Sequence, residues 1–207
     1  MTSSKLYRWE AALLLAFALT LTVGLWAGRS EAALAGQVLR LHVVANSDSE
    51  DDQALKLLAR DAVLACAGEI LDGSTSREDA ETLLAPRLDE LSAAAAGALM
   101  GAGCTDTVSA NLVDEWFPTK VYDGFSLPAG RYRALKITIG AGEGHNWWCV
   151  VFPPLCLGSV TEHSVETAAG DALSDDQVAL ITEQDGGYVL KFRLLEWWGE
   201  LTGKLEH

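Results

Sequence analysis

The spacing of apolar residues changes at Cys104, and this change most restricts what the chain can fold into. Before Cys104, apolar side chains recur mainly at three- and four-residue steps, which is the period of an amphipathic helix. Beyond it come short runs rich in β-branched and aromatic residues, separated by proline and glycine. The pattern predicts an α+β fold, a mostly antiparallel sheet with helices packed mainly on one face. A chain of 207 residues has enough apolar sequence for one such domain.

One segment ahead of the helices alternates between two faces, which is typical of a strand. It runs from Gln37 to Asn46. One face is apolar and holds Leu39, Leu41, Val43 and Ala45. The other face is mixed and holds Arg40, His42 and Val44.

Two helical segments are expected between this strand and Cys104. Apolar residues at helical spacing predict the first over about 50–71. Ser76 opens the second in an arrangement like a capping box, and Pro86 interrupts it before an alanine-rich stretch that runs to Met100. Glycines follow the end of both segments.

Three β-type runs follow, and the short connections between them favour antiparallel pairing. They cover residues 108–117, 131–140 and 147–152. Residues 157–186 are polar and irregular, with a helix expected near 175–183. A strand over 188–193 and a closing helix over 194–204 complete the prediction. We expect the Trp197–Trp198 pair of that helix to dock on the sheet rather than to bind a partner.

The first 35 residues have the order of a secretory signal, with a basic start, an apolar run and an exit of small residues. Seventeen uncharged residues run from Ala11 to Ala27. Small residues at Ser30 and Ala32 fit the two positions that a signal peptidase reads. We expect residues 1–32 to be a signal peptide, followed by a single globular domain over 33–207. The alternative is an uncleaved membrane anchor, because the apolar run is at the short end of what spans a bilayer.

The chain is strongly acidic. It carries 15 Lys and Arg against 29 Asp and Glu, a formal charge of −14 and a pI near 4.5. Repulsion from phosphates argues against a nucleic-acid partner. Removal of residues 1–32 takes away three basic and two acidic residues, so the exported domain would carry a charge of −15. This charge favours solubility beside anionic membranes, so we expect membrane contact only through the N-terminal segment.

The densest polar group lies where the first strand meets the first helix. It consists of Arg40, His42, Asn46, Ser47 and Asp48. The free N–H groups and positive dipole end of a following helix are typical of anion-binding sites. However, the acidic residues 48–52 would satisfy those N–H groups and repel an anion. Helix capping is therefore the favoured interpretation.

The sequence has no compact catalytic or metal-binding signature. Its four histidines lack the short spacing that zinc sites use, and no nucleophilic-serine motif is present. No cofactor-binding loop stands out either. We therefore expect neither an enzyme nor a cofactor.

The third β-type run contains two adjacent tryptophans, Trp147 and Trp148. Neighbouring side chains on a strand point to opposite faces. One tryptophan is therefore expected in the core, and the other nearer the surface as a contact residue.

The cysteines of the same run predict a disulfide. Pro153–Pro154 bends the chain between Cys149 and Cys156, which can bring the two thiols within bonding distance in an exported protein. The alternative is that both are small buried hydrophobic residues. A second bond between Cys66 and Cys104 is a further option.

Five blocks of residues, taken in this order, resemble the stage II sporulation protein R family of endospore-forming bacteria. They are Leu39–Ser49, Lys56 with Arg60–Val63, Phe117–Lys120, Leu127–Gly130 with Tyr132, and Asn146–Cys156. A weaker likeness is present at Glu196–Trp198. The resemblance implies a protein exported from the forespore into the space between the forespore and the mother cell. There it would activate a membrane-embedded aspartic protease that processes the sigma-E precursor.

The leading hypothesis is therefore an exported signalling protein that binds its protease directly, and the resemblance implies no catalytic residues. The candidate contact residues are Arg40, His42, Asn46, Ser47, Asp48, Asn146, Trp147 and Trp148. The alternative is an exported hydrolase acting on cell-wall material, with His42 as its base and Asp48 as the orienting group.

Overall fold

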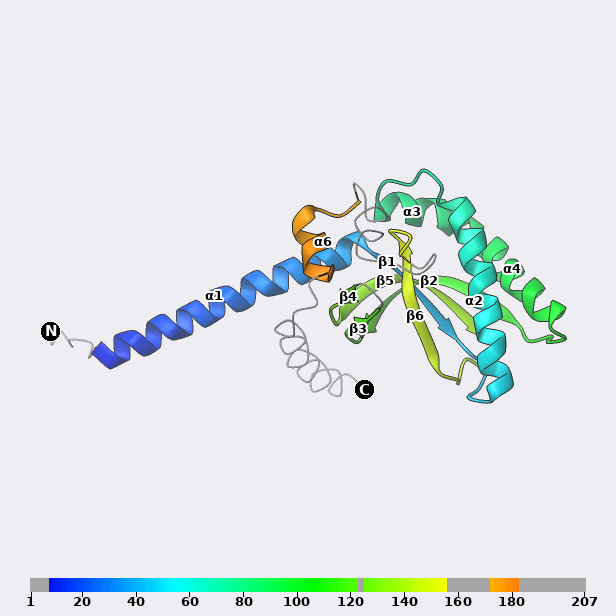
Figure 1. The fold of residues 1–207 in the computed structure, drawn as a ribbon, viewed down its shortest axis with the longest axis horizontal. Helices are drawn as coiled ribbons and strands as arrows, with labels where there is room; N and C mark the ends of the chain where they lie inside the picture. The colour runs from blue at the N-terminus through cyan, green and yellow to red at the C-terminus, as the bar shows by residue number, and fades with distance from the viewer. Residues whose placement is uncertain (1–7, 123–124, 156–171, 183–207) are drawn as a thin grey trace.

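The computed structural model describes residues 8–122, 125–155 and 172–182, and a four-stranded sheet lies at its centre (Figure 1). Its strands are β1 (Leu39–Val44), β2 (Val108–Phe117), β5 (Gly130–Ile139) and β6 (Asn146–Phe152). They lie in the order β2-β5-β1-β6. Each begins and ends within a few residues of its predicted bounds, and the fold is α+β as expected.

The first strand, β1, lies inside the sheet. It pairs antiparallel with β6 and parallel with β5, while β2 and β5 are antiparallel. The sheet is thus mixed but mostly antiparallel. The short connections seen in the sequence could not indicate the parallel pair, because three helices and β2 intervene between β1 and β5.

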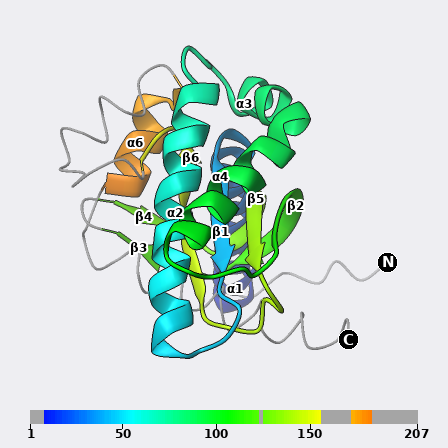
Figure 2. The same ribbon diagram turned by 90° about the vertical axis from the view of Figure 1, so that its right-hand side faces the viewer.

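Three helices cover one face of the sheet. They are α2 (Glu50–Ile70), α3 (Arg77–Leu84) and α4 (Leu88–Gly101). Figure 2 shows α2 and α4 in front of the strands. A 3₁₀ turn over Ala85–Arg87 separates α3 from α4, at the proline that predicted a break. In the main core, Leu41 and Ile137 of the sheet pack with Val63 and Leu99 of the helices, all fully buried.

The opposite face of the sheet holds a second, smaller core. It includes the last turn of α1 (Arg8–Gln37), the hairpin of β3 (Lys120–Val121) and β4 (Ser126–Leu127), and α6 (Asp175–Thr182). Leu34 of α1, Tyr132 of β5 and Val150 of β6 are buried in this core. The sequence indicated α6 but not β3 and β4, because two-residue strands are too short to show a period.

Helix α1 extends away from the domain, and its last turn joins the second core (Figure 1). Trp9, Leu15 and Phe17 on its outer part are exposed, whereas Leu34 is fully buried. The expected cleavage point after Ala32 lies inside this helix. No helix in the described ranges combines the length and hydropathy that crossing a membrane requires. The assignment of residues 1–32 stays a prediction.

Two further predicted elements, the strand over 188–193 and the helix over 194–204, lie outside the described residues. The same is true of the Trp197–Trp198 pair and of Cys156.

Candidate functional site

The predicted contact residues lie on β1, on the loop that follows it and at the start of β6. The two strands are neighbours, with Val44 opposite Asn146 and His42 opposite Trp148. Paired residues on neighbouring strands project to the same face. The structure therefore brings together the two groups of residues that the sequence singled out separately.

Arg40 is fully buried in the second core and presents no contact surface, which corrects the expectation from the sequence. Its Nε donates to the Cys149 carbonyl at 3.1 Å and its Nη2 donates to the Tyr122 hydroxyl at 2.8 Å. The guanidinium carbon lies 4.4 Å from the ring centroid of Phe117 and 5.0 Å from that of Tyr132. Arg40 thus holds the second core together.

His42 is nearly buried, and both of its ring nitrogens face acceptor oxygens. Nδ1 lies 2.6 Å from Glu115 Oε2, and Nε2 lies 2.8 Å from Asn146 Oδ1. Lys136 donates to the other oxygen of Glu115. We call His42, Glu115, Lys136 and Asn146 the His42 cluster.

The charge of Glu115 is set by these neighbours. Burial raises the pKa of the carboxyl, but hydrogen bonds and positive charge from Lys136 and His42 outweigh burial, so the net pKa is lowered. The carboxylate therefore stays ionised at neutral pH. Removing either donor would leave a half-buried charge short of a partner.

The loop after β1 is tied to α2 and to the connection between β5 and β6. Asn46 Oδ1 accepts from the Ala141 N–H at 2.9 Å, and the Asn46 amide donates to Asp52 at 3.0 Å. Ser47 Oγ donates to the same carboxylate at 2.5 Å. The hydrogen bond from Ser47, and after it the one from Asn46, lowers the pKa of Asp52. Asn46 and Ser47 are half-buried residues that position the loop.

Asp48 binds His145 and does not cap the helix, which corrects the expected role of the acidic residues. Its Oδ1 accepts from the His145 N–H at 2.6 Å and contacts Nδ1 of the same histidine. Ser49 caps α2 instead, because its Oγ accepts from the Asp52 N–H at 3.1 Å. Nearly buried Lys56 donates to the His145 carbonyl at 2.9 Å. Asp48 and His145 are exposed and form the accessible rim of this loop network.

The residue pair of the hydrolase hypothesis is not brought together. His42 binds Glu115 and Asn146, whereas Asp48 binds His145. The reason is geometric, since β1 directs His42 to the sheet face while Asp48 lies in the loop beyond. Within the described ranges, no group of three or more His, Cys, Asp or Glu side chains is placed to hold a metal ion.

The two tryptophans pack on opposite faces of the sheet, as strand geometry predicts, but both are half-buried. Trp147 packs against the main core, with Arg60 4.8 Å from its ring centroid. Trp148 packs against the second core, with Lys120 Nζ 5.0 Å from its ring centroid. The expectation of one core and one surface tryptophan is therefore only partly correct.

Three of the four cysteines lie among the described residues. Cys149 is buried and disulfide-bonded. Its predicted partner Cys156 lies outside the described residues, so the pairing itself stays a prediction. Cys66 and Cys104 are free, so the second bond considered between them is absent. Burial, and then the nearby acidic charges, raise the pKa of the Cys66 thiol, which keeps it protonated and poorly reactive.

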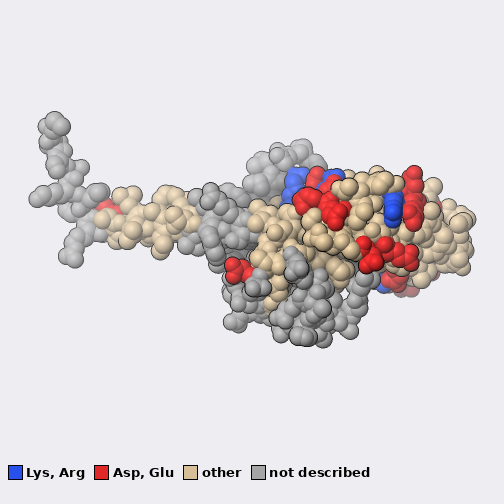
Figure 3. All heavy atoms as spheres, turned by 90° about the horizontal axis from the view of Figure 1, so that it is seen from above, with Lys and Arg blue, Asp and Glu red and all other residues tan. Residues whose placement is uncertain are grey.

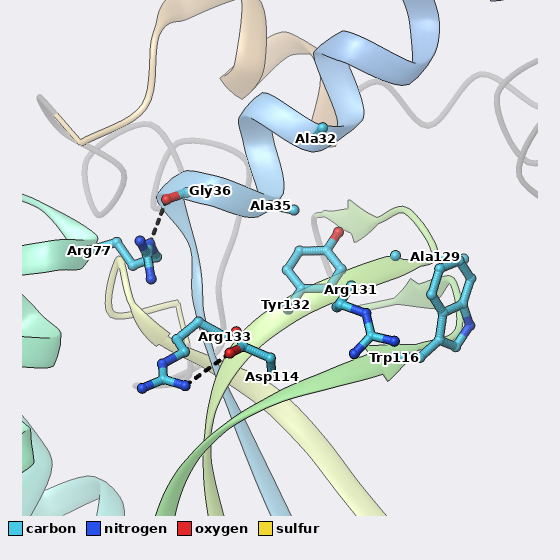
Figure 4. A pocket seen from close by; sticks show the side chains of 11 residues that line it. Ala32, Ala35, Gly36, Arg77, Asp114, Trp116, Ala129, Arg131, Tyr132 and Arg133 are labelled. Carbon is cyan, nitrogen blue, oxygen red and sulfur yellow. Dashed lines mark hydrogen bonds and ion pairs between the residues drawn. The ribbon is translucent and has the colours of Figure 1, made fainter. Parts of the chain in front are cut away.

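A pocket that the sequence did not indicate opens beside the end of α1 (Figure 4). Its volume is about 480 Å³, and its lining includes Ala32, Trp116 and Arg131. Trp116 and Arg131 are cross-strand partners on β2 and β5, and both are exposed. Arg77 Nε donates to the Gly36 carbonyl at 2.6 Å, which joins α3 to the end of α1. The sequence feature that could have indicated this pocket is Trp116, an exposed tryptophan in an alternating strand.

The sequence of this chain is similar to that of known proteins over most of its length. The model of the family described as "Stage II sporulation protein R (spore_II_R)" matches residues 35–162. A protein of Bacillus subtilis (strain 168) named "Stage II sporulation protein R" is 34% identical over 182 residues, which cover 80% of this chain and 81% of that protein. No solved structure matches. Because the family model matches more than half of the chain and this relative is 34% identical over 80% of it, the chain belongs to the stage II sporulation protein R family.

Proposed function

We propose that this protein is an exported signal that activates a membrane-embedded aspartic protease and so leads to processing of the sigma-E precursor. Membership of the family implies a role in sporulation signalling. The family match over residues 35–162 is the observation that carries the proposal. We further propose that the protein acts between the forespore and the mother cell, after removal of residues 1–32.

Activation by binding requires that the protein bind the active state of the protease more tightly than the inactive state. A rigid surface favours such binding, because little side-chain freedom is lost on contact. Asp48 and His145 are exposed and bonded to each other, and exposed Asn146 is bonded to His42. We place the protease contact on Asp48, His145 and Asn146, beside half-buried Trp148.

Sporulating cells provide the test. In cells that lack this protein, we expect the sigma-E precursor to stay uncleaved on an immunoblot, and the wild-type protein to restore cleavage. His145→Ala is expected to reduce cleavage while export and the melting temperature stay close to those of the wild type, because its side chain is exposed and its backbone contacts to Asp48 and Lys56 are kept. Glu90→Ala, an exposed change on α4, serves as the matched control and is expected to have no effect.

Normal precursor cleavage in cells without the protein would overturn the proposed function. Normal cleavage with His145→Ala would overturn only the placement of the contact surface. A mass measurement of the released protein tests the proposed removal of residues 1–32. A chain starting at Ala33 is expected, and an intact N-terminus would contradict cleavage.

A further inference from the structure

The strand β2 forms one edge of the sheet, and no strand among the described residues pairs with its outer side. It runs for ten residues and pairs with β5 along its whole length without a bulge. Figure 2 shows β2 at the margin of the sheet. An unpaired strand presents backbone N–H and C=O groups to which another extended chain can bond. We call the outer side of β2 the open edge.

The pairing with β5 determines which backbone groups lie on the open edge. The Gly140 N–H donates to the Thr107 carbonyl at 2.8 Å, so these two residues form a hydrogen-bonded pair at the start of the ladder. Hydrogen-bonded and non-hydrogen-bonded pairs alternate along antiparallel strands. Odd-numbered residues of β2 therefore bond to β5, and even-numbered residues direct their N–H and C=O groups outward. The outward residues are Val108, Ala110, Leu112, Asp114 and Trp116.

The open edge lacks the features that usually protect an edge strand from pairing, such as proline, lysine, a bulge or free charges. β2 contains neither proline nor lysine. Its two charged residues are both bonded to side chains of β5. Asp114 accepts from Arg133 at 3.1 Å, and Glu115 accepts from Lys136. No charge of β2 is therefore left to repel an added strand.

The opposite edge of the sheet is closed by side chains. In β6, the Trp148 carbonyl accepts from the Tyr122 hydroxyl at 3.2 Å, and the Cys149 carbonyl accepts from Arg40 Nε at 3.1 Å. Two prolines follow β6 and cannot continue a ladder. The two edges thus differ, and β2 is the edge that is available for backbone pairing.

The outward residues of β2 also share an apolar face. Val108, Ala110 and Leu112 pack against the main core but are only half-buried. Trp116 is 54% exposed, and with Asp114 it lines the pocket of about 480 Å³ beside the end of α1 (Figure 4). Residues opposite each other on neighbouring strands project to the same face. A strand added at the open edge would therefore cover the apolar row and direct a side chain towards the pocket.

We propose that β2 is a docking strand for a protein partner, and that an extended segment of the partner adds to the sheet beside it. The segment has apolar residues at every second position, one of them an aromatic side chain that enters the pocket beside Trp116. Backbone bonds give this mode of binding its affinity, and side-chain pockets give it selectivity. The inference rests on the proposed function only in taking the partner to be a protein.

An uncharged segment of a partner fits the open edge better than a second copy of this chain. Each copy carries a net charge of −14. In the view of Figure 3, Asp and Glu make up most of the charged surface. Two such chains repel each other, whereas an uncharged segment meets no such repulsion.

The test follows amide hydrogen exchange by NMR in isotope-labelled full-length protein. The probe is a short capped peptide of alternating Thr and Val, with Phe in place of one Val. The control peptide has the same side chains but carries N-methyl groups on its Val and Phe amides, which removes the backbone donors of that side. Both peptides are used with the wild-type protein, so this comparison needs no variant that must fold.

Two variants test the pocket. Trp116→Ala removes the exposed ring beside it, and Trp9→Ala makes the same change at an exposed tryptophan on the outer part of α1. Trp9 also reports on nonspecific binding of an apolar peptide to that helix. Circular dichroism verifies that both variants are folded.

In the free protein, we expect the outward Leu112 amide to exchange rapidly and the Val113 amide, which bonds to β5, to exchange slowly. The peptide at saturation is expected to slow exchange at Ala110 and Leu112 by about tenfold or more, and the N-methylated peptide to leave it unchanged. Trp116→Ala is expected to weaken binding by about tenfold, and Trp9→Ala by less than about twofold.

Three results would overturn the proposal. They are unchanged exchange at Ala110 and Leu112, equal binding of the two peptides, and equal losses in the two tryptophan variants. A dimer of the free protein in analytical ultracentrifugation, with the Leu112 amide protected only in the dimer, would overturn it in favour of a second copy.

The result separates this inference from the proposed function. If the peptide does not bind but precursor cleavage in cells still depends on the protein, only the docking strand is wrong. If the peptide binds while cells without the protein cleave the precursor normally, the proposed function is wrong and the docking strand stands.

Discussion

Arg40 carries a positive charge in the second core with no carboxylate partner among the described residues. Aromatic rings and two neutral oxygens stabilise it instead. Such a residue contributes through packing as much as through charge, because its long side chain fills space between the rings. Truncating it would leave both a cavity and unpaired polar groups.

The first prediction concerns this side chain. We expect Arg40→Ala to lower the free energy of unfolding by about 3 kcal/mol, and Arg40→Met, which keeps most of the volume, to lower it by less. Urea denaturation measures both. Arg131→Ala, at an exposed arginine, is the control and is expected to change stability by less than about 0.5 kcal/mol. Unchanged stability in Arg40→Ala would contradict the structural role given to Arg40.

The second prediction concerns pH. The pKa of Glu115 is lowered in the folded protein from its ordinary value of 4.5. Its contribution to stability is therefore complete above about pH 4.5 and is lost as the pH falls through the lowered value. We expect Glu115→Gln to lower stability at pH 7 and to weaken the further loss of stability below pH 4.5. Urea denaturation across this range decides, and parallel curves for the two proteins would contradict the account.

At the scale of elements, the loop after β1 and the connection between β5 and β6 are packed against each other through glycine. The Gly144 N–H donates to the Ala45 carbonyl at 3.0 Å. A Cβ at Gly144 would lie 2.2 Å from the Ser47 carbonyl oxygen, so any side chain there would push backbone apart. This close approach holds Asp48 beside His145.

The third prediction follows from that approach. We expect Gly144→Ala to lower the free energy of unfolding by about 3 kcal/mol, because the clash is with backbone. Gly97→Ala on α4 is the matched control, since nothing lies within 4 Å of its Cβ. There alanine is expected to raise stability by about 0.5–1 kcal/mol, from better helix propensity. Thermal unfolding measures both, and a stable Gly144→Ala protein would contradict the packing.

The fourth prediction tests the cap of α2. Ser49→Ala removes the acceptor for the Asp52 N–H and is expected to lower stability by about 1 kcal/mol. Ser49→Asp keeps an acceptor and is expected to stay close to the wild type. If chemical denaturation gave equal stabilities for Ser49→Ala and the wild type, the neighbouring acids would be capping the helix after all.

Local patterns determined the elements, but not how distant elements meet. The bounds of α2 and of β2 follow from apolar spacing within each segment. The parallel pairing of β1 with β5 depends on contacts between segments far apart in the chain, which no local pattern contains. For the same reason alternation placed Arg40 on the correct face but did not show that the second core buries it. Glu115, the partner of His42, was also missed, because β2 is distant in sequence.

At the scale of the whole molecule, the net charge of −14 is distributed unevenly. Composition gives this charge but not its neighbours in space, such as the Trp148 ring that Lys120 meets where β3 and β6 come together. The proposed protease contact borders the His42 cluster through Asn146, which is bonded to His42.

We propose that direct binding of this protein activates the protease. The most direct measurement reconstitutes the membrane-embedded protease with the sigma-E precursor in vesicles and follows cleavage as the purified protein is added. We expect a cleavage rate that rises with protein concentration and saturates, as a binding equilibrium requires. A rate that does not change at any concentration would contradict it.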